Sequence, residues 1–540
     1  MFIKITKSKN YKYLQIVESY RENGSIKHRV LFNLGRLDLL NKNSQLANIG
    51  KKLLELTGHK VDLIDDMKEH SRVIYGHIVY RKLWDRFDFK DVILSLKKQT
   101  KINFALDEII YYLVINRLLA PSSKKRAYER QGNYYKIQQN IQLQHIYRSL
   151  DFLSDNKEQI EKYIYNRQLN LFNIKVDVVF YDVTTFNYES NDADELRDFG
   201  FSKANKINEV QVVLGLLINS EGRPIGYELF EGNISETKTL LKSIEKISKR
   251  YKINKVVIVA DKAMHSKSNL HMIRQAGYDY IVSSKIMNAS SQIKEAIFDE
   301  SGYHHKIDEQ SGEIIYSYKD IPNKFTYKDE QGRTYEYEDR LIISWSEERA
   351  KKDYKKQQRL IQRAQKLVEG KNKTLVQKKG AKRYLKTDTV AKITALDHDK
   401  IEQDAKWHGY YAVQYSGNKL THQQVMEQYH QLWKIEESFR IMKSTMRTRP
   451  IFHWTPKRIK GHFMLCYIAF VLERTLEIKL RRNGVELSAE QIKDHLNTLQ
   501  LSEIHLNDKR FYLKSKNSSQ ASKILRALKI KPFKNIVEIE

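Results

Sequence analysis

The sequence predicts an α/β fold with a mixed sheet and flanking helices, and three features of the middle of the chain support this prediction. β-branched and aromatic runs, typical of buried strands, occur at 174–186 and 254–263. Two further runs flank a turn at 220–222, as in a hairpin. Amphipathic segments at 237–251 and 266–277 are typical of helices that cover a sheet. The resulting order of strand, hairpin, helix, strand, helix and strand indicates an α/β domain.

The length and charge of the chain indicate several domains and a polyanionic partner. A chain of 540 residues is too long to fold around one core. The formal net charge of +29 favours nucleic acid as the partner. The alternative is a merely soluble basic protein from a lysine-rich proteome. The predicted parts are a small β-rich N-terminal segment (1–65), an α-helical DNA-binding domain (66–171), the α/β domain (172–288 and 426–480), an insertion domain (289–425) and a C-terminal helical region (481–540).

Several classes of protein are disfavoured by what the sequence lacks. The single cysteine, Cys466, excludes an internal disulfide and any Cys-based zinc site. Neither GxGxxG nor GxxxxGK[ST] occurs in the α/β region, which argues against a nucleotide cofactor. The N-terminus is charged where a signal peptide is apolar, and the longest apolar run, 463–472, is too short to span a bilayer. We therefore expect a cytoplasmic protein with no membrane partner, nucleoid-associated if DNA is the partner.

Within the α-helical region, a helix, a short turn and a basic helix are compatible with helix-turn-helix docking on DNA. Residues 106–119 are apolar all round and end before a proline, which predicts a buried helix. Ser122 and Ser123 can cap a second helix, beginning KKRAYER, in which Lys124 and Arg126 are the candidate DNA contacts. The alternative is a structural turn, since many all-helical domains contain one.

The insertion is polar and strongly basic in one stretch. Segments such as TYEYEDRLIISWS and GYYAVQYS have strand character. Residues 351–386 contain fourteen Lys or Arg against only Asp353 and Glu369. Such a run predicts either a solvated face or a track for a nucleic-acid backbone.

The stretch from Tyr429 to Lys443 is predicted to be a helix whose charged residues share one face. At about 100° per residue, Tyr429, Glu436 and Lys443 line up along one stripe. An apolar stripe lies beside it, so Glu436 is expected at the edge of the buried face. A carboxylate at this position lowers the stability of the fold, which indicates a functional role. The alternative is a Glu at the edge of the core that is paired with a neighbouring cation. The apolar stripe consists of Leu432, Ile435, Phe439 and Met442.

Three acidic residues are the candidate metal ligands. Asp182 lies at or near the end of one predicted strand and Asp261 ends another, where α/β folds place their ligand sites. With Glu436 from a packed helix they would form a cluster of oxygen ligands that suits Mg²⁺, with Mn²⁺ as a substitute. Two such ions about 3.5–4 Å apart could activate a water or a 3′-hydroxyl. Tyr429 and Lys443 would then contact the scissile phosphate.

These acids, in this order and setting, resemble those of the DDE transposases of insertion sequences. YDVTTF resembles the first-aspartate strand of that family, and VIVADKAM resembles the second-aspartate strand. Tyr429, Glu436 and Lys443 match the Y-x2-R-x3-E-x6-K signature of the insertion-sequence-four group, although Leu432 replaces the arginine. The resemblance covers about 172–475. It implies an RNase H-like catalytic core interrupted by a β-rich insertion before the glutamate.

The resemblance implies a transposase that binds the terminal inverted repeats of its element, cleaves double-stranded DNA and joins the freed 3′-hydroxyl to target DNA. Because two ends must be paired, it also implies a homodimer in a synaptic complex. Leu432 removes a phosphate contact, for which Arg440 or Lys434 is the candidate replacement. Family members stack a flipped base on a tryptophan of the insertion, and Trp407 is the candidate here, with a core role as the alternative.

Two other functions are compatible with the same sequence. An RNase H-like nuclease would hydrolyse DNA without strand transfer. A domesticated DNA-binding protein would retain the fold without the chemistry. The presence of Asp182, Asp261, Glu436 and Lys443 argues against the second, because only chemistry requires all four.

Overall fold

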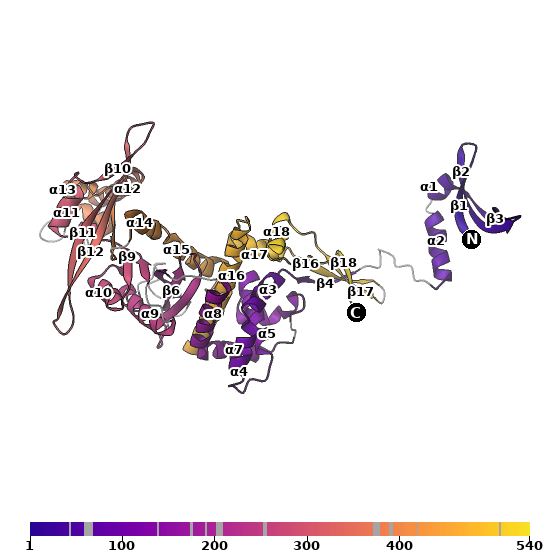
Figure 1. Cartoon of the computed structure of the whole chain (residues 1–540), viewed down its shortest axis with the longest axis horizontal. Coiled ribbons are helices and arrows are strands. Elements are labelled where there is room, and N and C mark those ends of the chain that lie inside the picture. The colour runs from indigo at the N-terminus through magenta and orange to yellow at the C-terminus, as the bar shows by residue number, and fades with distance from the viewer. Residues whose placement is uncertain are drawn as a thin grey trace. The chain divides into compact units, whose positions relative to one another are not determined.

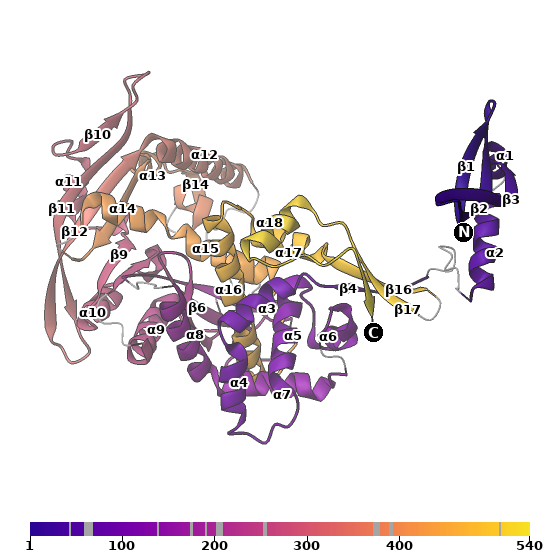
Figure 2. The ribbon, with the colours of Figure 1, turned by 45° about the vertical axis from the view of Figure 1, so that its right-hand side comes forward.

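The chain forms two compact units in the computed structural model (Figures 1 and 2). The first comprises Met1–Val73, Leu501–Ser515 and Phe533–Glu540, and the second comprises Ile74–Gln500 and Lys516–Pro532. The structure describes residues 1–42, 45–58, 68–137, 140–172, 177–189, 192–200, 209–251, 256–370, 379–387, 392–417, 420–506 and 509–539.

The first unit begins with an antiparallel three-stranded sheet, as its strand-like segments predict. β1 (Phe2–Ser8), β2 (Tyr11–Glu22) and β3 (Ser25–Arg36) are adjacent in that order. The turn between β2 and β3 is formed by Asn23 and Gly24, which have positive φ values of 50° and 79°. Asn-Gly is the pair that such a tight hairpin turn prefers. The helices α1 (Leu37–Lys42) and α2 (Gln45–Leu56) follow.

The C-terminal region, predicted to be helical, contains strands as well as helices. The first unit holds a second sheet of order β18-β17-β16-β4. Strands β16, β17 and β18 pair with near neighbours in sequence, whereas β4 joins β16 from more than 400 residues away. The helices α17 and α18 of this region belong to the second unit. The elements are β4 (Lys68–Ile74), β16 (Gln500–Leu506), β17 (Lys509–Lys514), β18 (Ile536–Ile539), α17 (Ala489–Asn497) and α18 (Ser519–Ala527).

The second unit begins with a helical bundle built around α5 (Leu106–Leu119). Nearly every side chain of α5 is buried, as its all-round apolar sequence predicts. It packs against α7 and against α16 (Pro456–Arg482), which is also almost wholly buried. Helix α6 begins after Ser123, whose hydroxyl accepts a hydrogen bond from the Arg126 amide, as predicted. The other helices are α3 (Ile78–Arg86), α4 (Phe89–Lys97), α6 (Lys124–Glu129), α7 (Leu143–Asp155) and α8 (Lys157–Phe172).

Helices α7 and α16 approach each other closely at Gly461. A Cβ at this position would lie 2.0 Å from the carbonyl oxygen of Leu150. Gly461→Ala should therefore force the helices apart and lower the free energy of unfolding by about 1–3 kcal/mol, measured by urea denaturation. Gly132→Ala is the matched control, because a Cβ there meets nothing within 4 Å. Equal stability of the two variants would contradict this packing.

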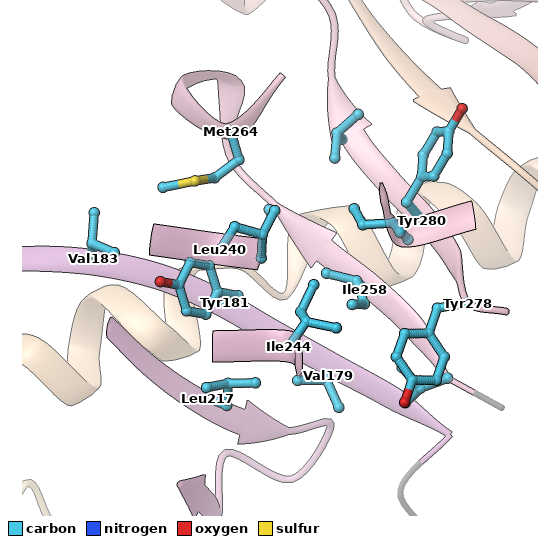
Figure 3. Close-up of a cluster of buried hydrophobic side chains, with 14 of the residues drawn as sticks. Val179, Tyr181, Val183, Leu217, Leu240, Ile244, Ile258, Met264, Tyr278 and Tyr280 are labelled. Atoms are coloured by element: carbon cyan, nitrogen blue, oxygen red, sulfur yellow. The ribbon is translucent and has the colours of Figure 1, made fainter. Parts of the chain in front are cut away.

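The second unit also contains a nine-stranded mixed sheet of order β10-β11-β12-β15-β9-β8-β5-β6-β7. β5 pairs antiparallel with β6 and parallel with β8, and β8 pairs parallel with β9. One face is covered by α9 (Glu236–Tyr251) and α10 (Lys267–Gln275), whose apolar residues pack on the sheet (Figure 3). The strands of this half are β5 (Val178–Asn187), β6 (Gln211–Asn219), β7 (Pro224–Glu231), β8 (Val257–Ala260) and β9 (Asp279–Ser283).

The insertion continues this sheet. Its strand β15 pairs with β12 on one side and with β9 on the other, so four insertion strands extend the sheet. Part of the basic run forms the long, mostly exposed helix α12. The elements are α11 (Ser291–Phe298), β10 (His304–Ile307), β11 (Ile314–Lys328), β12 (Thr334–Ser346), α12 (Glu347–Glu369), β13 (Leu385–Thr387), β14 (Ile393–Leu396), α13 (His398–Ala405) and β15 (Tyr410–Tyr415).

The apolar run at 463–472 lies within α16. None of the helices in the described part of the chain combines the length and apolarity that crossing a bilayer requires.

Candidate active site

The parallel pairing of β5 and β8 brings Asp182 and Asp261 to neighbouring positions. The last paired residues are Tyr181 and Ala260, and each aspartate follows directly. Asp261 therefore lies where β8 ends, as predicted. Asp182 instead lies within β5, because β6 pairs with β5 as far as Asn187. The two carboxylates thus start from adjacent strands at one level of the sheet.

Asp182 belongs to the face of the sheet opposite α9. Val179, Tyr181 and Val183 are buried in the core cluster with Leu240 of α9 (Figure 3). Because successive side chains of a strand alternate between faces, Asp182 and Thr184 lie on the other face. Helix α15 contacts β5 and β6. The half-buried Asp182 carboxylate accepts a hydrogen bond from the Val183 amide at 2.7 Å.

The predicted continuous helix at 429–443 is divided into three pieces. α14 (His422–His430) begins with a capping box and ends before Gln431. α15 (Trp433–Arg440) follows and bears Glu436. The last piece, η6 (Ile441–Thr445), is a π-helical turn that bears Lys443. The predicted stripe assumed an unbroken α-helix, and a π turn alters that register; such turns are frequent at functional sites.

Lys443 nonetheless reaches the face of β5 to which Asp182 belongs. Its ammonium donates a hydrogen bond to the hydroxyl of Thr184, two residues along the strand. It also lies 5.4 Å from the centre of the Phe186 ring. A cation is therefore held beside the position of the first aspartate.

The Tyr429 phenol interacts electrostatically with both the second aspartate, Asp261, and Glu436. Burial raises the pKa of the Tyr429 phenol, the charges of Asp261 and Glu436 raise it further, and a hydrogen bond with Ser283 opposes them. The phenol thus lies within electrostatic reach of both carboxylates. Glu436 and Asp261 are themselves exposed to solvent.

The chemistry of these donors suits a hard divalent cation, because all are carboxylate oxygens. In this structure, however, the three acids do not form a complete metal-binding site. Within the described ranges, no three His, Cys, Asp or Glu side chains form a group that could hold a metal ion.

Comparison with known proteins identifies the family. A model of the transposase DDE domain matches residues 175–472, more than half of the chain. The chain belongs to the DDE transposase family. Residues 3–59 match the N-terminal domain of IS1634 family transposases. Transposase DDE domains generally use divalent metal ions, in agreement with the oxygen donors above.

No curated protein gives a significant match to this transposase. One solved structure with some similarity is a piggyBac transposase synaptic complex with hairpin DNA, determined by cryo-electron microscopy. It is 10% identical, and the alignment covers 79% of this chain and 80% of that chain, with a TM-score of 0.35.

The candidates for the missing signature arginine differ in their surroundings. Leu432 lies at the break between α14 and α15. The ammonium of Lys434 donates to the Ser220 carbonyl at 2.5 Å and to the Gln431 side chain at 2.8 Å, so it is already engaged. Arg440 is exposed and lies 3.5 Å from Glu437 in a weak surface ion pair. Arg440 is therefore the better placed of the two to contact DNA.

The other predicted DNA contacts of the transposase differ in exposure. Trp407 is half-buried in the core of the insertion, with its ring 4.8 Å from that of Phe298. Arg126 is exposed on α6, whereas Lys124 is buried. Both stay candidate DNA contacts, but only Arg126 lies on the surface of the helix.

The exposure of two aromatic residues, Phe452 and Trp454, was not predicted from the sequence. Phe452 and Trp454 are 59% and 64% exposed, unusual values for such large apolar side chains. The guanidinium of Arg197 lies 5.6 Å from the Trp454 ring and donates to the Trp454 carbonyl at 3.2 Å. Exposure of this kind depends on tertiary packing. The sequence showed only an aromatic, basic segment, IFHWTPKR.

Proposed function

We propose that this transposase binds the terminal inverted repeats of an insertion sequence, cleaves the DNA there and joins the freed 3′-hydroxyl to target DNA. The observation that supports this most is the neighbouring register of Asp182 and Asp261, with Lys443 on the Asp182 face, inside a transposase DDE domain. Because the reaction joins two element ends, we propose a homodimer as the active form.

Asp182, Asp261 and Glu436 would hold Mg²⁺ or Mn²⁺. When bound, these ions activate a water or a 3′-hydroxyl and stabilise the leaving oxygen. Asp182 and Asp261 start from adjacent strands, so they form the fixed part of the set. Glu436 is exposed at the start of α15, and we propose that it completes the set when DNA and metal neutralise the acids.

Lys443 and Tyr429 would position the phosphate. The Lys443 ammonium is fixed by Thr184 beside the metal position, where it can offer further donors to a phosphate oxygen. The Tyr429 phenol keeps its proton at neutral pH, because burial and two carboxylates raise its pKa. It therefore acts as a hydrogen-bond donor. Arg440, exposed one turn beyond Glu436, would contact the neighbouring backbone.

The strand order supports an RNase H-like core. β7, β6 and β5 form an antiparallel meander, and β8 and β9 continue from β5 in parallel. Numbered in chain order, these five strands lie in the order 3-2-1-4-5, which agrees with the mixed sheet proposed for the catalytic domain. The first aspartate then comes from the central strand and the second from its parallel neighbour.

A strand-transfer assay tests the proposed function. The substrate is a duplex from the element end with a pre-cut 3′-hydroxyl, incubated with Mg²⁺ and a target plasmid. Joined products are expected from the transposase. Cleavage of uncut ends without joined products would indicate a nuclease, and end binding without either reaction would indicate a domesticated DNA-binding protein. Either result would overturn the proposal.

A further inference from the structure

Two adjoining hollows in the second unit are lined by basic residues. The inner hollow, of about 260 Å³, lies between the α5–α6 connection, the segment 450–453 and α16. The outer hollow, of about 510 Å³, shares Ser122, Ser123 and Phe452 with it. Among the described residues, no Asp or Glu lines either hollow. The basic lining residues are Arg117, Lys124 and Lys125 of the inner hollow, and Arg126, Arg130, Arg447 and Lys493 of the outer hollow.

The inner hollow contains two buried cations without a carboxylate partner. Arg117 and Lys124 are 5% and 6% exposed, and neither forms an ion pair within the described ranges. Buried charges in proteins are normally paired, because an isolated one is costly. Burial, together with the positive charge of Arg117, lowers the pKa of Lys124 to about 7. These unpaired buried cations therefore lower the stability of the fold, and a bound anion would offset that loss.

Two residues that line the inner hollow also have buried polar atoms without a partner among the described residues. Arg117 donates to the carbonyl oxygens of Met446 and Arg447 at 3.2 and 2.8 Å, which fixes its guanidinium, yet its Nε has no partner in the described structure. His462, 2% exposed, contacts the Thr448 carbonyl through Nε2, while its buried Nδ1 likewise lacks a partner among the described residues. Of these two atoms, only the Arg117 Nε–H is a donor, and a buried donor without a partner calls for an explanation that a nearby anion would supply.

The adjacent histidines do not add charge. Burial, together with the positive charges of Lys124 and Arg117, lowers the pKa of His453 to about 3. Burial likewise lowers the pKa of His462 well below its usual range, with the same two cations as secondary causes. Both rings are therefore neutral, and the single N–H of His462 is donated from Nε2 to the Thr448 carbonyl, so the charge of the hollow comes from Arg117, Lys124 and Lys125.

We propose that the inner hollow binds one backbone phosphate of a DNA strand, held by Lys124 and Arg117, while the neighbouring nucleotides lie in the outer hollow. This inference rests on the proposed function. A DNA strand is favoured over a free anion because the outer hollow continues the basic lining, and the exposed Phe452 at the shared rim offers a ring on which a base or sugar can stack.

The test compares Lys124→Met with Lys90→Met, an exposed lysine of α4 that lines neither hollow. The probe is a labelled duplex of arbitrary sequence, since phosphate contacts do not depend on sequence. Binding is measured against salt. Lys124→Met should reduce the slope of log affinity against log salt by about one phosphate contact and should raise the thermal midpoint without DNA. Lys90→Met should change the midpoint little.

The outcomes separate this inference from the proposed function. If the unmodified transposase binds no duplex, both fail. If it binds and Lys124→Met has an unchanged slope, only the phosphate site fails. An equal loss of slope in Lys90→Met would indicate general charge and overturn the site. Inorganic phosphate that raises the thermal midpoint of the unmodified chain but not of Lys124→Met, with an unchanged DNA slope, would assign the hollow to a free anion instead.

Discussion

Glu436→Gln should reduce Mg²⁺-dependent cleavage of the element end by about 10³-fold while leaving end binding unchanged. The substitution keeps the shape of the side chain and removes only the charge that would complete the metal set. Loss of one charged ligand removes several kcal/mol of transition-state stabilisation, and each 1.4 kcal/mol is tenfold in rate. Cleavage is measured as nicked duplex against time, and binding by a mobility shift with Ca²⁺ in place of Mg²⁺.

The matched control is Glu427→Gln, an exposed glutamate on the neighbouring helix α14. It removes the same charge from the same region, so its cleavage rate should remain within about twofold, as for surface changes generally. Asp182→Asn and Asp261→Asn should behave like Glu436→Gln. Full activity in any of these three variants would eliminate the proposed metal set.

Arg474→Met should lower the free energy of unfolding by about 3–5 kcal/mol, the cost of leaving buried acids without their cation. The Arg474 guanidinium is 3% exposed and contacts Glu477 at 2.8 Å and Glu437 at 3.0 Å. It also donates to the Gly222 carbonyl at 3.1 Å. Arg474 thus joins α16 to α15 and to the β6–β7 turn, and its loss should also loosen the helix that bears Glu436. The measurement is urea denaturation.

Arg481→Met controls for loss of positive charge from α16, because Arg481 is exposed near the end of the same helix. Its stability should stay within about 0.5 kcal/mol of the unmodified chain. A second test substitutes Gly222, whose carbonyl oxygen accepts a hydrogen bond from Arg474. Gly222 has a positive φ of 82°, and a Cβ there would lie 2.4 Å from the Arg474 guanidinium, so Gly222→Ala should destabilise for both reasons. If Gly222→Ala destabilises the protein and Arg474→Met does not, the ion pairs of Arg474 contribute little to stability.

The parts of the fold that local sequence determines were predictable. Buried strands around Asp182 and Asp261 follow from β-branched runs, and the parallel register of β5 and β8 then brings the two acids together. The Asn23-Gly24 turn and the Ser123 cap are likewise local, because a backbone angle or one hydrogen bond decides them.

What depends on tertiary contacts could not be predicted. The periodicity of 429–443 is that of one helix, and nothing in it reveals the break at Gln431 or the π turn that bears Lys443. The sequence marked Lys124 as a candidate DNA contact of a basic helix, but its periodicity did not show that the side chain is buried. The role proposed for Lys124 in the inner hollow depends on that burial.

The continuity of the nine-stranded sheet constrains how such enzymes can diversify. Strand β15 forms backbone hydrogen bonds with both β12 and β9, so residues 289–425 cannot be removed without disrupting the sheet. A chimaera that excised them would leave β9 as an open edge, ready to pair with another chain. When relatives exchange this region, the incoming segment must therefore also contain a strand that pairs with β9.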